Sequence, residues 1–267
     1  MTPDWRPIGV FDSGVGGLTV LRALRRALPT ADFVYLGDTA RLPYGTKSPD
    51  TVRRYALQAA EALRGRSVGA LVVACNTASG VALDALAARW PDIPVVGVVE
   101  PGAAAACRVS PGGDIAVIGT ESTIRGGAYQ SAIHRLRPDA RVRARSCSVF
   151  VALAEEGWFD TPAAEAVARA YLGEWLDGPA PPDTLVLGCT HFPVLAGLLG
   201  RVAGSALRLV DSASTTARVL AERLEERVSG FGRVQYLATD GPERFAAVGS
   251  RFLGVAIATE DVEIVDL

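Results

Sequence analysis

The sequence is poor in lysine and histidine. Its 267 residues carry 27 basic side chains, of which Lys47 is the only lysine, and it has two histidines, His134 and His191. Lys47 lies in the turn-rich segment 45–49, which predicts an exposed loop. A pyridoxal enzyme forms its Schiff base with a buried lysine. This composition therefore argues against that cofactor.

The cysteines lack the close spacing of a metal knuckle or a redox motif. There are four, Cys75, Cys107, Cys147 and Cys189, and none forms a C-x-x-C pair. In a reducing compartment such cysteines stay thiols rather than forming a disulfide framework. We therefore expect most of them to be free thiols, and no metal site.

Long apolar runs and a strong net charge are also missing. No apolar stretch reaches the ~18 residues of a membrane span, and Met1–Pro7 lacks the basic and apolar pattern of a signal peptide. With a net charge of -2 we expect a cytoplasmic protein that binds neither membrane nor nucleic acid. We interpret one local group of arginines as a charged strand at the edge of a sheet. It consists of Arg135, Arg137, Arg141, Arg143 and Arg145.

Two similar stretches organise the rest of the chain. Residues 71–80 and 185–193 each read as a buried strand, rich in Val and Leu, that ends at a cysteine followed by a polar residue. Cys75 and Cys189 would then lie at the carboxyl ends of parallel strands, where open α/β sheets bind ligands. A helix N-terminus beside each sulfur would favour the thiolate.

The strand pattern repeats along the chain. Ile8 and Ile115 begin similar strands 107 residues apart, Cys75 and Cys189 are 114 apart, and the segments 98–100 and 209–211 are 111 apart. Any alternating βα chain can show such a spacing, but three landmarks favour an internal duplication. The predicted fold is α/β, with two similar domains, each a mainly parallel sheet flanked by helices. Further strands are expected at 33–36, 94–99 and 234–237, and helices from 211 to Val228 and from 242 to 253.

Two domains with facing strand ends would put Cys75 and Cys189 on opposite walls of one interdomain cleft, a common position for a ligand. Inverting a carbon stereocentre requires removing a proton from one face and adding one to the other. Two opposed thiols, one ionised and one not, meet that requirement.

Polar residues at other strand ends fit a small anionic amino acid. Hydroxyls, amides and backbone N–H groups at helix starts can bind carboxylates without a cationic side chain. These positions are Ser13, Asn76, Thr77, Thr120 and Thr190. Asp12, Glu155 and His191 could adjust the proton balance of a thiol or hold the substrate ammonium.

Each of these residues has a simpler interpretation. A single cysteine that ends an apolar strand is more often a packed side chain, and we keep that interpretation for Cys107 and Cys147. Asp12 could be only an N-cap, and Glu155 only a surface residue. A zinc site made of Cys75, Cys189 and His191 is conceivable.

A nucleotide-dependent oxidoreductase is the main alternative among enzymes. Gly14 and Gly16 follow a strand and open a helix, and Asp38 lies near the end of the next strand, where a ribose-binding acid belongs. However, Thr19 stands where the third small residue should be. Asp12 would also place a carboxylate beside a pyrophosphate. A non-catalytic amino-acid-binding protein is the third possibility.

Five segments together resemble glutamate racemases, over nearly the whole chain. The first two distinguish that family from aspartate and hydantoin racemases. The segments are 11–18 (FDSGVGGL), 37–45 (GDTARLPYG), 74–78 (ACNTA), 97–102 (GVVEPG) and 187–193 (LGCTHFP).

The resemblance implies interconversion of L- and D-glutamate without a cofactor, to supply D-glutamate for peptidoglycan. Cys75 would act on the α-proton of the D-enantiomer and Cys189 on that of the L-enantiomer, assisted by Asp12, Glu155 and His191. The residues that would hold glutamate are Asp12, Ser13, Tyr44, Gly45, Asn76, Thr77, Thr120, Thr190 and His191.

The resemblance also implies a homodimer whose chain returns to its first domain. The first domain would comprise residues 1–97 and 207–267, and the second residues 98–206. Two segments depart from the family pattern, at Cys147-Ser148 with the following residues 150–155, and at 238–241. The first departure concerns the loop that carries Glu155.

Overall fold

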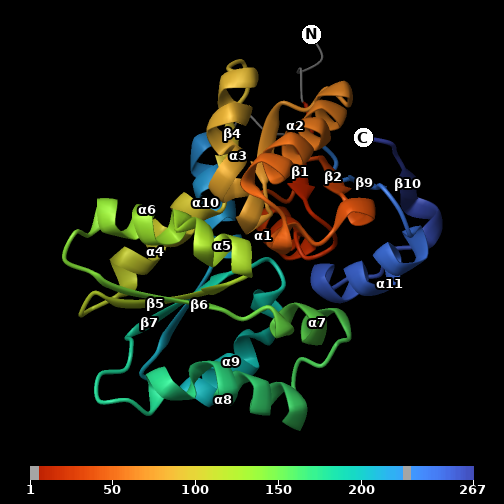
Figure 1. Ribbon diagram of the computed structural model, residues 1–267. Coiled ribbons are helices and arrows are strands. Elements are labelled where there is room, and N and C mark those ends of the chain that lie inside the picture. The colour runs from red at the N-terminus through yellow and green to blue at the C-terminus, as the bar shows by residue number, and fades with distance from the viewer. Residues whose placement is uncertain (1–5, 225–229) are drawn as a thin grey trace.

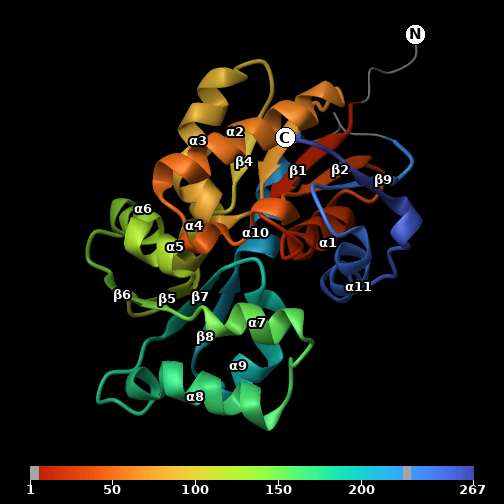
Figure 2. The same cartoon turned by 45° about the vertical axis from the view of Figure 1, so that its right-hand side comes forward.

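Two parallel β-sheets form the core of the computed structural model, and the chain passes from the first to the second and back (Figure 1). The structure describes residues 6–224 and 230–267. Figure 2 shows the two sheets in separate lobes, with α10 between them. The predicted α/β fold of two similar parallel sheets flanked by helices is confirmed.

The first sheet has six strands, all paired in parallel. In spatial order they are β10 (Val262–Ile264), β9 (Val234–Ala238), β2 (Phe33–Gly37), β1 (Ile8–Asp12), β3 (Ala70–Val73) and β4 (Val95–Gly97). Its helices are α1 (Leu18–Ala27), α2 (Pro49–Gly65), α3 (Asn76–Arg89), α10 (Ser212–Leu224) and α11 (Pro242–Leu253). Short 3₁₀ turns lie at Thr39–Arg41, Tyr44–Thr46 and Thr259–Asp261.

The second sheet has four strands and repeats the central order of the first. The strands are β6 (Arg141–Ser146), β5 (Asp114–Gly119), β7 (Thr184–Gly188) and β8 (Arg208–Asp211). The order β6-β5-β7-β8 corresponds to β2-β1-β3-β4, as the duplication predicts. Its helices are α4 (Val99–Val109), α5 (Glu121–Gly126), α6 (Ala128–Leu136), α7 (Val149–Glu155), α8 (Pro162–Leu176) and α9 (Ala196–Ala203), with a 3₁₀ turn at Phe192–Leu195.

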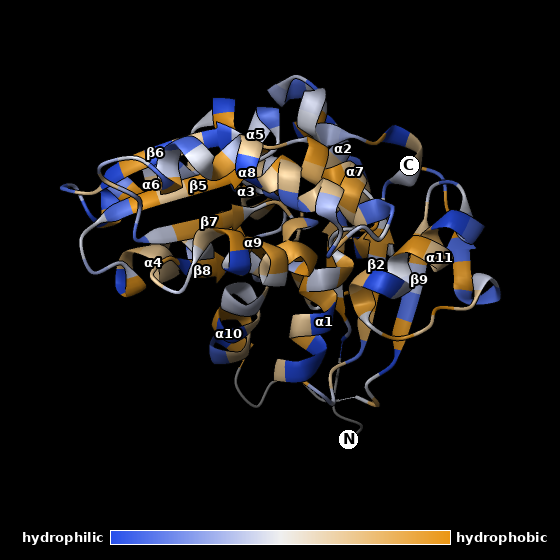
Figure 3. Cartoon of the chain, turned by 90° about the horizontal axis from the view of Figure 1, so that it is seen from below, coloured by the Kyte–Doolittle hydropathy of each residue, from blue (hydrophilic) through white to orange (hydrophobic). Residues whose placement is uncertain are grey.

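Alternate residues of each strand face different cores, because side chains alternate across a sheet. Val10 and Val72 pack with α1, α10 and α11 on one face, whereas Phe11 and Val73 pack with α2 and α3 on the other. The second sheet is likewise buried on both faces. Figure 3 shows hydrophobic residues concentrated on the strands and hydrophilic ones on the outer helix surfaces.

The ends of several helices follow from local sequence. The Ser48 side chain accepts the N–H of Thr51 at 3.3 Å, and Pro49 occupies the first turn of α2, where its missing N–H costs nothing. Asp211 accepts the N–H of Ser214 at 2.8 Å and caps α10 as predicted. The predicted continuation of that helix to Val228 lies outside the described residues.

One predicted boundary is wrong. The strand expected at 94–99 ends at Gly97, because the N–H of Val98 binds the hydroxyl of Ser79 at 3.0 Å and α4 begins at Val99. The end of the second domain, predicted at 206, lies just before β8, which pairs in parallel with β7. The chain therefore leaves the second sheet only after Asp211.

The predicted arginine-rich edge strand is β6, which borders the second sheet and carries Arg141, Arg143 and Arg145. The other two arginines of the group lie outside the strand, Arg135 in α6 and Arg137 at its C-cap. The arginines of β6 are paired with acids: Arg143 reaches Asp114 at 2.9 Å and Arg145 reaches Glu174 at 2.6 Å. These pairs make the edge charged and unsuitable for pairing with another strand. Among the described residues, no helix has the length and apolar character needed to cross a bilayer.

Candidate active site

Two adjacent strands in each sheet carry predicted site residues at their carboxyl ends. Asp12 ends β1, Cys75 follows β3 as the N-cap of α3, and Thr120 follows β5 as the N-cap of α5. Cys189 follows β7 directly. Since β1 pairs with β3, and β5 with β7, each sheet contributes two adjacent strand ends.

The Cys75 thiol is buried and favours its protonated form. Its sulfur accepts the N–H of Ala78 at 3.5 Å, at the start of α3. Burial and then the charge of Asp12 raise the pKa of Cys75 to about 12, and hydrogen bonds from Ala78 and Ser13 only partly oppose that rise. The expected shift toward the thiolate is therefore wrong for Cys75. Burial destabilises a thiolate by more than the N-terminus of α3 stabilises it.

Asp12 links the two halves of the site. It is fully buried, and its Oδ2 accepts the N–H of Gly14 at 3.0 Å. Burial raises its pKa, against the charge of His191 and the N–H groups of residues 13, 14 and 17. The same carboxylate raises the pKa of Cys75, so its charge interacts with groups on both sides of the site.

A chain of polar contacts surrounds Cys189. Its sulfur lies 3.8 Å from Nδ1 of His191, whose Nε2 lies 3.0 Å from Oε1 of Glu155. Burial would lower the pKa of His191, but hydrogen bonds and charge from Cys189 and Glu155 raise it to about 10. The hydrogen bond from His191 lowers the pKa of Glu155 despite burial.

The two sulfurs share one electrostatic environment. Cys189 raises the pKa of Cys75, although 113 residues separate them along the chain. The strength of such an interaction falls with the distance between the two charges. The two sulfurs have contrasting surroundings: a carboxylate acts on Cys75, and an imidazole lies beside Cys189.

Hydroxyls from both lobes meet between α3 and α5. Oγ1 of Thr77 lies 3.1 Å from that of Thr120 and 2.9 Å from that of Thr123, and the latter two are 3.0 Å apart. Nearby, the Tyr129 hydroxyl donates to Oδ1 of Asn76 at 2.7 Å. The predicted residues Asn76, Thr77 and Thr120 are thus brought together.

Two glycines allow the lobes to approach closely. A Cβ on Gly16 would lie 2.4 Å from Nδ1 of His191 and 2.5 Å from Oγ1 of Thr190. A Cβ on Gly45 would lie 2.7 Å from Cβ of Thr120. Each distance is shorter than real Cβ contacts allow, so a side chain at either position would displace a predicted site residue.

Tyr44 is buried, and its hydroxyl donates to the carboxylate of Asp38. Asp38 also accepts from Arg41 at 2.7 Å and from Thr239 at 3.0 Å. Its carboxylate is therefore engaged within the protein. The N–H of Gly14 is likewise bound by Asp12, so the features that suggested a dinucleotide site serve internal contacts.

The structure also bears on two other interpretations of the cysteines, a metal site and simple packing. Among the described residues, no group of three or more His, Cys, Asp or Glu side chains could hold a metal ion. Cys147 is buried, with its pKa raised to about 12 by burial, and Cys107 is partly buried with its sulfur 3.8 Å from the Ile133 carbonyl. Both fit the packed interpretation.

Four residues near the site were not predicted. Thr123 follows Thr120 by one helical turn, a spacing that could have revealed it. Tyr129, Arg244 and Phe252 reach the site through packing between distant segments, for which the sequence carries no local signal.

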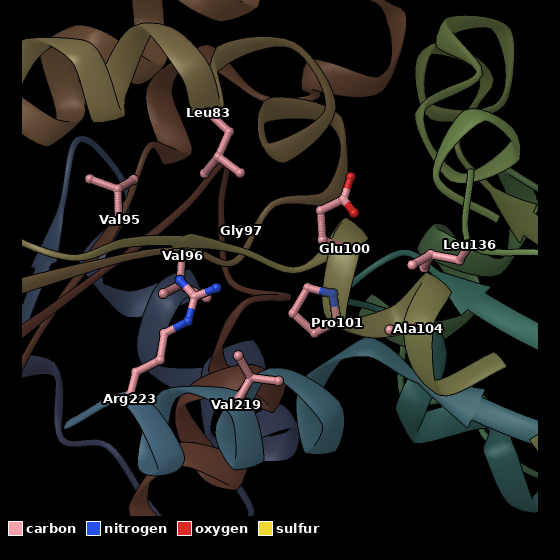
Figure 4. A pocket seen from close by; sticks show the side chains of 10 residues that line it. All are labelled: Leu83, Val95, Val96, Gly97, Glu100, Pro101, Ala104, Leu136, Val219 and Arg223. Carbon is pink, nitrogen blue, oxygen red and sulfur yellow. The ribbon is translucent and has the colours of Figure 1, made fainter. Parts of the chain in front are cut away.

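A separate cavity of about 270 Å³ lies where α3, β4, α4 and α10 meet (Figure 4). Figure 4 shows the charged side chains of Glu100 and Arg223 and the apolar Val96, Pro101 and Val219 among the residues that line it. None of the predicted site residues lines it. It is therefore distinct from the cluster around the two thiols.

Comparison with known proteins identifies the class. A sequence profile described as Asp/Glu/hydantoin racemase matches residues 8–220. The chain belongs to this racemase family, which is a family of isomerases.

Individual relatives narrow the class to one activity. The glutamate racemase of Geobacter metallireducens is 52% identical over 255 residues, which are 94% of this chain and 93% of that protein. The crystal structure of glutamate racemase from Thermus thermophilus in complex with β-chloro-D-alanine has 46% identity and a TM-score of 0.87, covering 98% of this chain and 97% of that one. The structure of glutamate racemase from Francisella tularensis in complex with D-glutamate has 35% identity and a TM-score of 0.89, covering 98% of both chains.

Proposed function

We propose that the protein interconverts L- and D-glutamate without a cofactor, by proton transfer at Cα between Cys75 and Cys189. The observation that carries this proposal is the contrast between the two sulfurs. Burial and the charge of Asp12 raise the pKa of Cys75, whereas Nδ1 of His191 lies 3.8 Å from the sulfur of Cys189. A two-base racemase starts each turnover with one thiol and one thiolate, which unequal surroundings of the two sulfurs support.

For L-glutamate, the proposed reaction starts with a thiolate at Cys189 and a thiol at Cys75. The Cys189 thiolate removes the α-proton, and the electron pair of the C–H bond remains on the substrate as a carbanion delocalised into the α-carboxylate. The Cys75 thiol then donates its proton to the opposite face. The turnover leaves a thiol at Cys189 and a thiolate at Cys75, which is the state that D-glutamate requires.

Asp12, Glu155 and His191 restore the balance of protons between turnovers. Asp12 is electrostatically coupled to both Cys75 and His191. Its Oδ1 is buried without a hydrogen-bond partner among residues 6–224 and 230–267. Because burial already raises the pKa of Asp12, this oxygen is suited to accept a proton in exchange with Cys75.

Glutamate would be held by backbone N–H groups and neutral side chains at the strand ends. The hydroxyl cluster of Thr77, Thr120 and Thr123 offers three donors to a carboxylate. The relative from Francisella tularensis that was solved with D-glutamate supports this choice of substrate. The residues proposed to bind glutamate are Asp12, Ser13, Tyr44, Gly45, Asn76, Thr77, Thr120, Thr190 and His191.

The experiment uses purified protein and L-glutamate alone. Circular dichroism should decay to zero without added cofactor, since the enantiomers are equal in free energy. In heavy water, the newly formed D-glutamate should carry deuterium at Cα from the first turnover. Binding without loss of dichroism would indicate a non-catalytic binding protein, and activity only with added nucleotide would indicate an oxidoreductase.

We further propose that the protein works in the cytoplasm as a homodimer and supplies D-glutamate for peptidoglycan. We also propose two domains, 1–97 with 212–267 and 98–211, which follow the strand pairing. Light scattering of the purified chain tests the dimer. Depletion of the protein in a bacterium should cause lysis that external D-glutamate relieves.

A further inference from the structure

The C-terminal helix α11 contacts the residues on the Cys189 side of the site at three points. Nη2 of Arg244 donates to Oε2 of Glu155 at 2.8 Å, and Nη1 of Arg251 donates to the main-chain carbonyl of Glu155 at 2.7 Å. The ring of Phe252 meets that of His191 edge-on, with centroids 5.2 Å apart. Figures 1 and 2 show α11 of one lobe facing α7 of the other.

We propose that Arg244 is a positioning residue, which holds Oε2 of Glu155 so that Oε1 stays bound to Nε2 of His191. Arg244 touches neither sulfur and is 65% exposed. It would therefore act on the reaction only through Glu155 and His191. The inference concerns the same site as the proposed function and rests on it for its kinetic part.

Packing alone does not fix the Glu155 carboxylate. A cavity of about 180 Å³ adjoins it, lined by Val15, Leu42, Arg244 and Phe245 among others. Arg251 and the end of α7 hold the backbone of Glu155, but the side chain beyond it has room to rotate. The carboxylate is bound by His191 at Oε1 and by Arg244 at Oε2, and the bond from Arg244 fixes the oxygen that His191 leaves free.

Positioning and simple charge predict opposite effects on His191. The charged groups around this imidazole are Cys189, Asp12 and Glu155, with Arg244 behind Glu155. A nearby cation disfavours an imidazolium, so removing Arg244 would raise the pKa of His191 if charge alone mattered. If Arg244 holds the carboxylate in place, removing it weakens the bond between Glu155 and His191, and the pKa falls.

The two histidines allow a direct measurement. In protein with ¹⁵N-labelled histidine, the ring nitrogens of His191 can be titrated by NMR with the exposed His134 as an internal reference. In Arg244→Ala we expect the midpoint of His191 to fall by about half a pH unit, the size that an exposed ion pair can supply. The His134 midpoint should not move. An unchanged or raised His191 midpoint would overturn the proposal.

Kinetics provide the second readout. We expect kcat/KM of Arg244→Ala to fall about threefold, by the same factor in both directions because the enantiomers are equal in free energy. Arg244→Lys keeps the charge and a donor and should recover part of both changes. Arg169→Ala is the matched control: Arg169 is 63% exposed, pairs with Glu165 on α8 and should change neither readout.

The two readouts separate this inference from the proposed function. The NMR titration needs no turnover, so it remains decisive if the wild-type protein does not racemise glutamate. Conversely, the wild-type protein could be active while the His191 midpoint does not move in Arg244→Ala. The proposed function would then stand, and Arg244 would not be a positioning residue.

Discussion

Nε2 of His191 and Oε1 of Glu155 lie 3.0 Å apart, across two segments that are 36 residues apart in the chain. Against burial, hydrogen bonds with Cys189 and then with Glu155 raise the pKa of His191 to about 10. A buried imidazolium would be costly without such partners. The contact with Glu155 thus contributes to the charge next to Cys189.

Replacing His191 by asparagine should slow the reaction strongly. Asn keeps a polar side chain of similar size but cannot carry the proton, so we expect kcat/KM to fall by about 10²- to 10⁴-fold. In the wild type, kcat/KM should decrease above pH 10, as His191 loses its proton. That decrease should be absent from the residual activity of His191→Asn. A variant with the wild-type rate would remove His191 from the mechanism.

The same pair should make stability depend on pH. The folded-state pKa of His191 lies above its unfolded value of 6.5, so its contribution is complete below 6.5 and lost as pH rises through about 10. The pKa of Glu155 is lowered, so its contribution is lost as pH falls below its usual 4.5. Urea unfolding should show a decline from pH 6.5 to 10 that is smaller in His191→Asn. An equal decline in both proteins would contradict this assignment.

Gly16→Ala tests the close approach between the lobes. The added methyl group would meet the His191 ring and the Thr190 hydroxyl at 2.4 to 2.5 Å, so the ring must move. We expect kcat to fall by about 10²-fold, the effect of a 1 Å misplacement of a reacting group. Gly65→Ala is the control, since a Cβ there meets nothing within 4 Å. Comparable kcat values for the two variants would show that the contact does not matter.

Thr77→Val tests the hydroxyl cluster. Valine keeps the shape but removes the hydroxyl that reaches both Thr120 and Thr123. A hydrogen bond to a charged group contributes about 1.5–3 kcal/mol, so KM for glutamate should rise by at least tenfold with less change in kcat. Thr215→Val is the control, because the Thr215 hydroxyl binds only carbonyls at the start of its own helix. An unaltered KM in Thr77→Val would exclude Thr77 from substrate binding.

Strand ends were the part of the site that the sequence predicted well. Apolar runs that stop at Cys75 and Cys189 indicate parallel strands, and parallel strands bring their carboxyl ends to one edge. The sequence alone therefore predicts that the polar residues after those strands lie close together. The repeated order of strands in the two sheets was visible in the same way.

Other features depend on three-dimensional packing that local sequence does not encode. The pKa of Cys75 rises because the effect of burial is larger than that of the N–H groups at the start of α3. The surrounding core sets the degree of burial. Arg244 reaches Glu155 from 89 residues away. The strand before α4 ends early because the Ser79 side chain binds the N–H of Val98. Each of these contacts joins segments whose proximity follows from the fold alone.

The most direct test of the account is α-hydrogen exchange in heavy water by Cys75→Ala and Cys189→Ala, followed separately with each enantiomer by NMR. With one sulfur left, neither variant should racemise glutamate. Cys75→Ala should exchange the α-hydrogen of L-glutamate only, and Cys189→Ala that of D-glutamate only. Racemisation by either variant, or exchange of both enantiomers by one of them, would contradict the assignment of one sulfur to each face of the substrate.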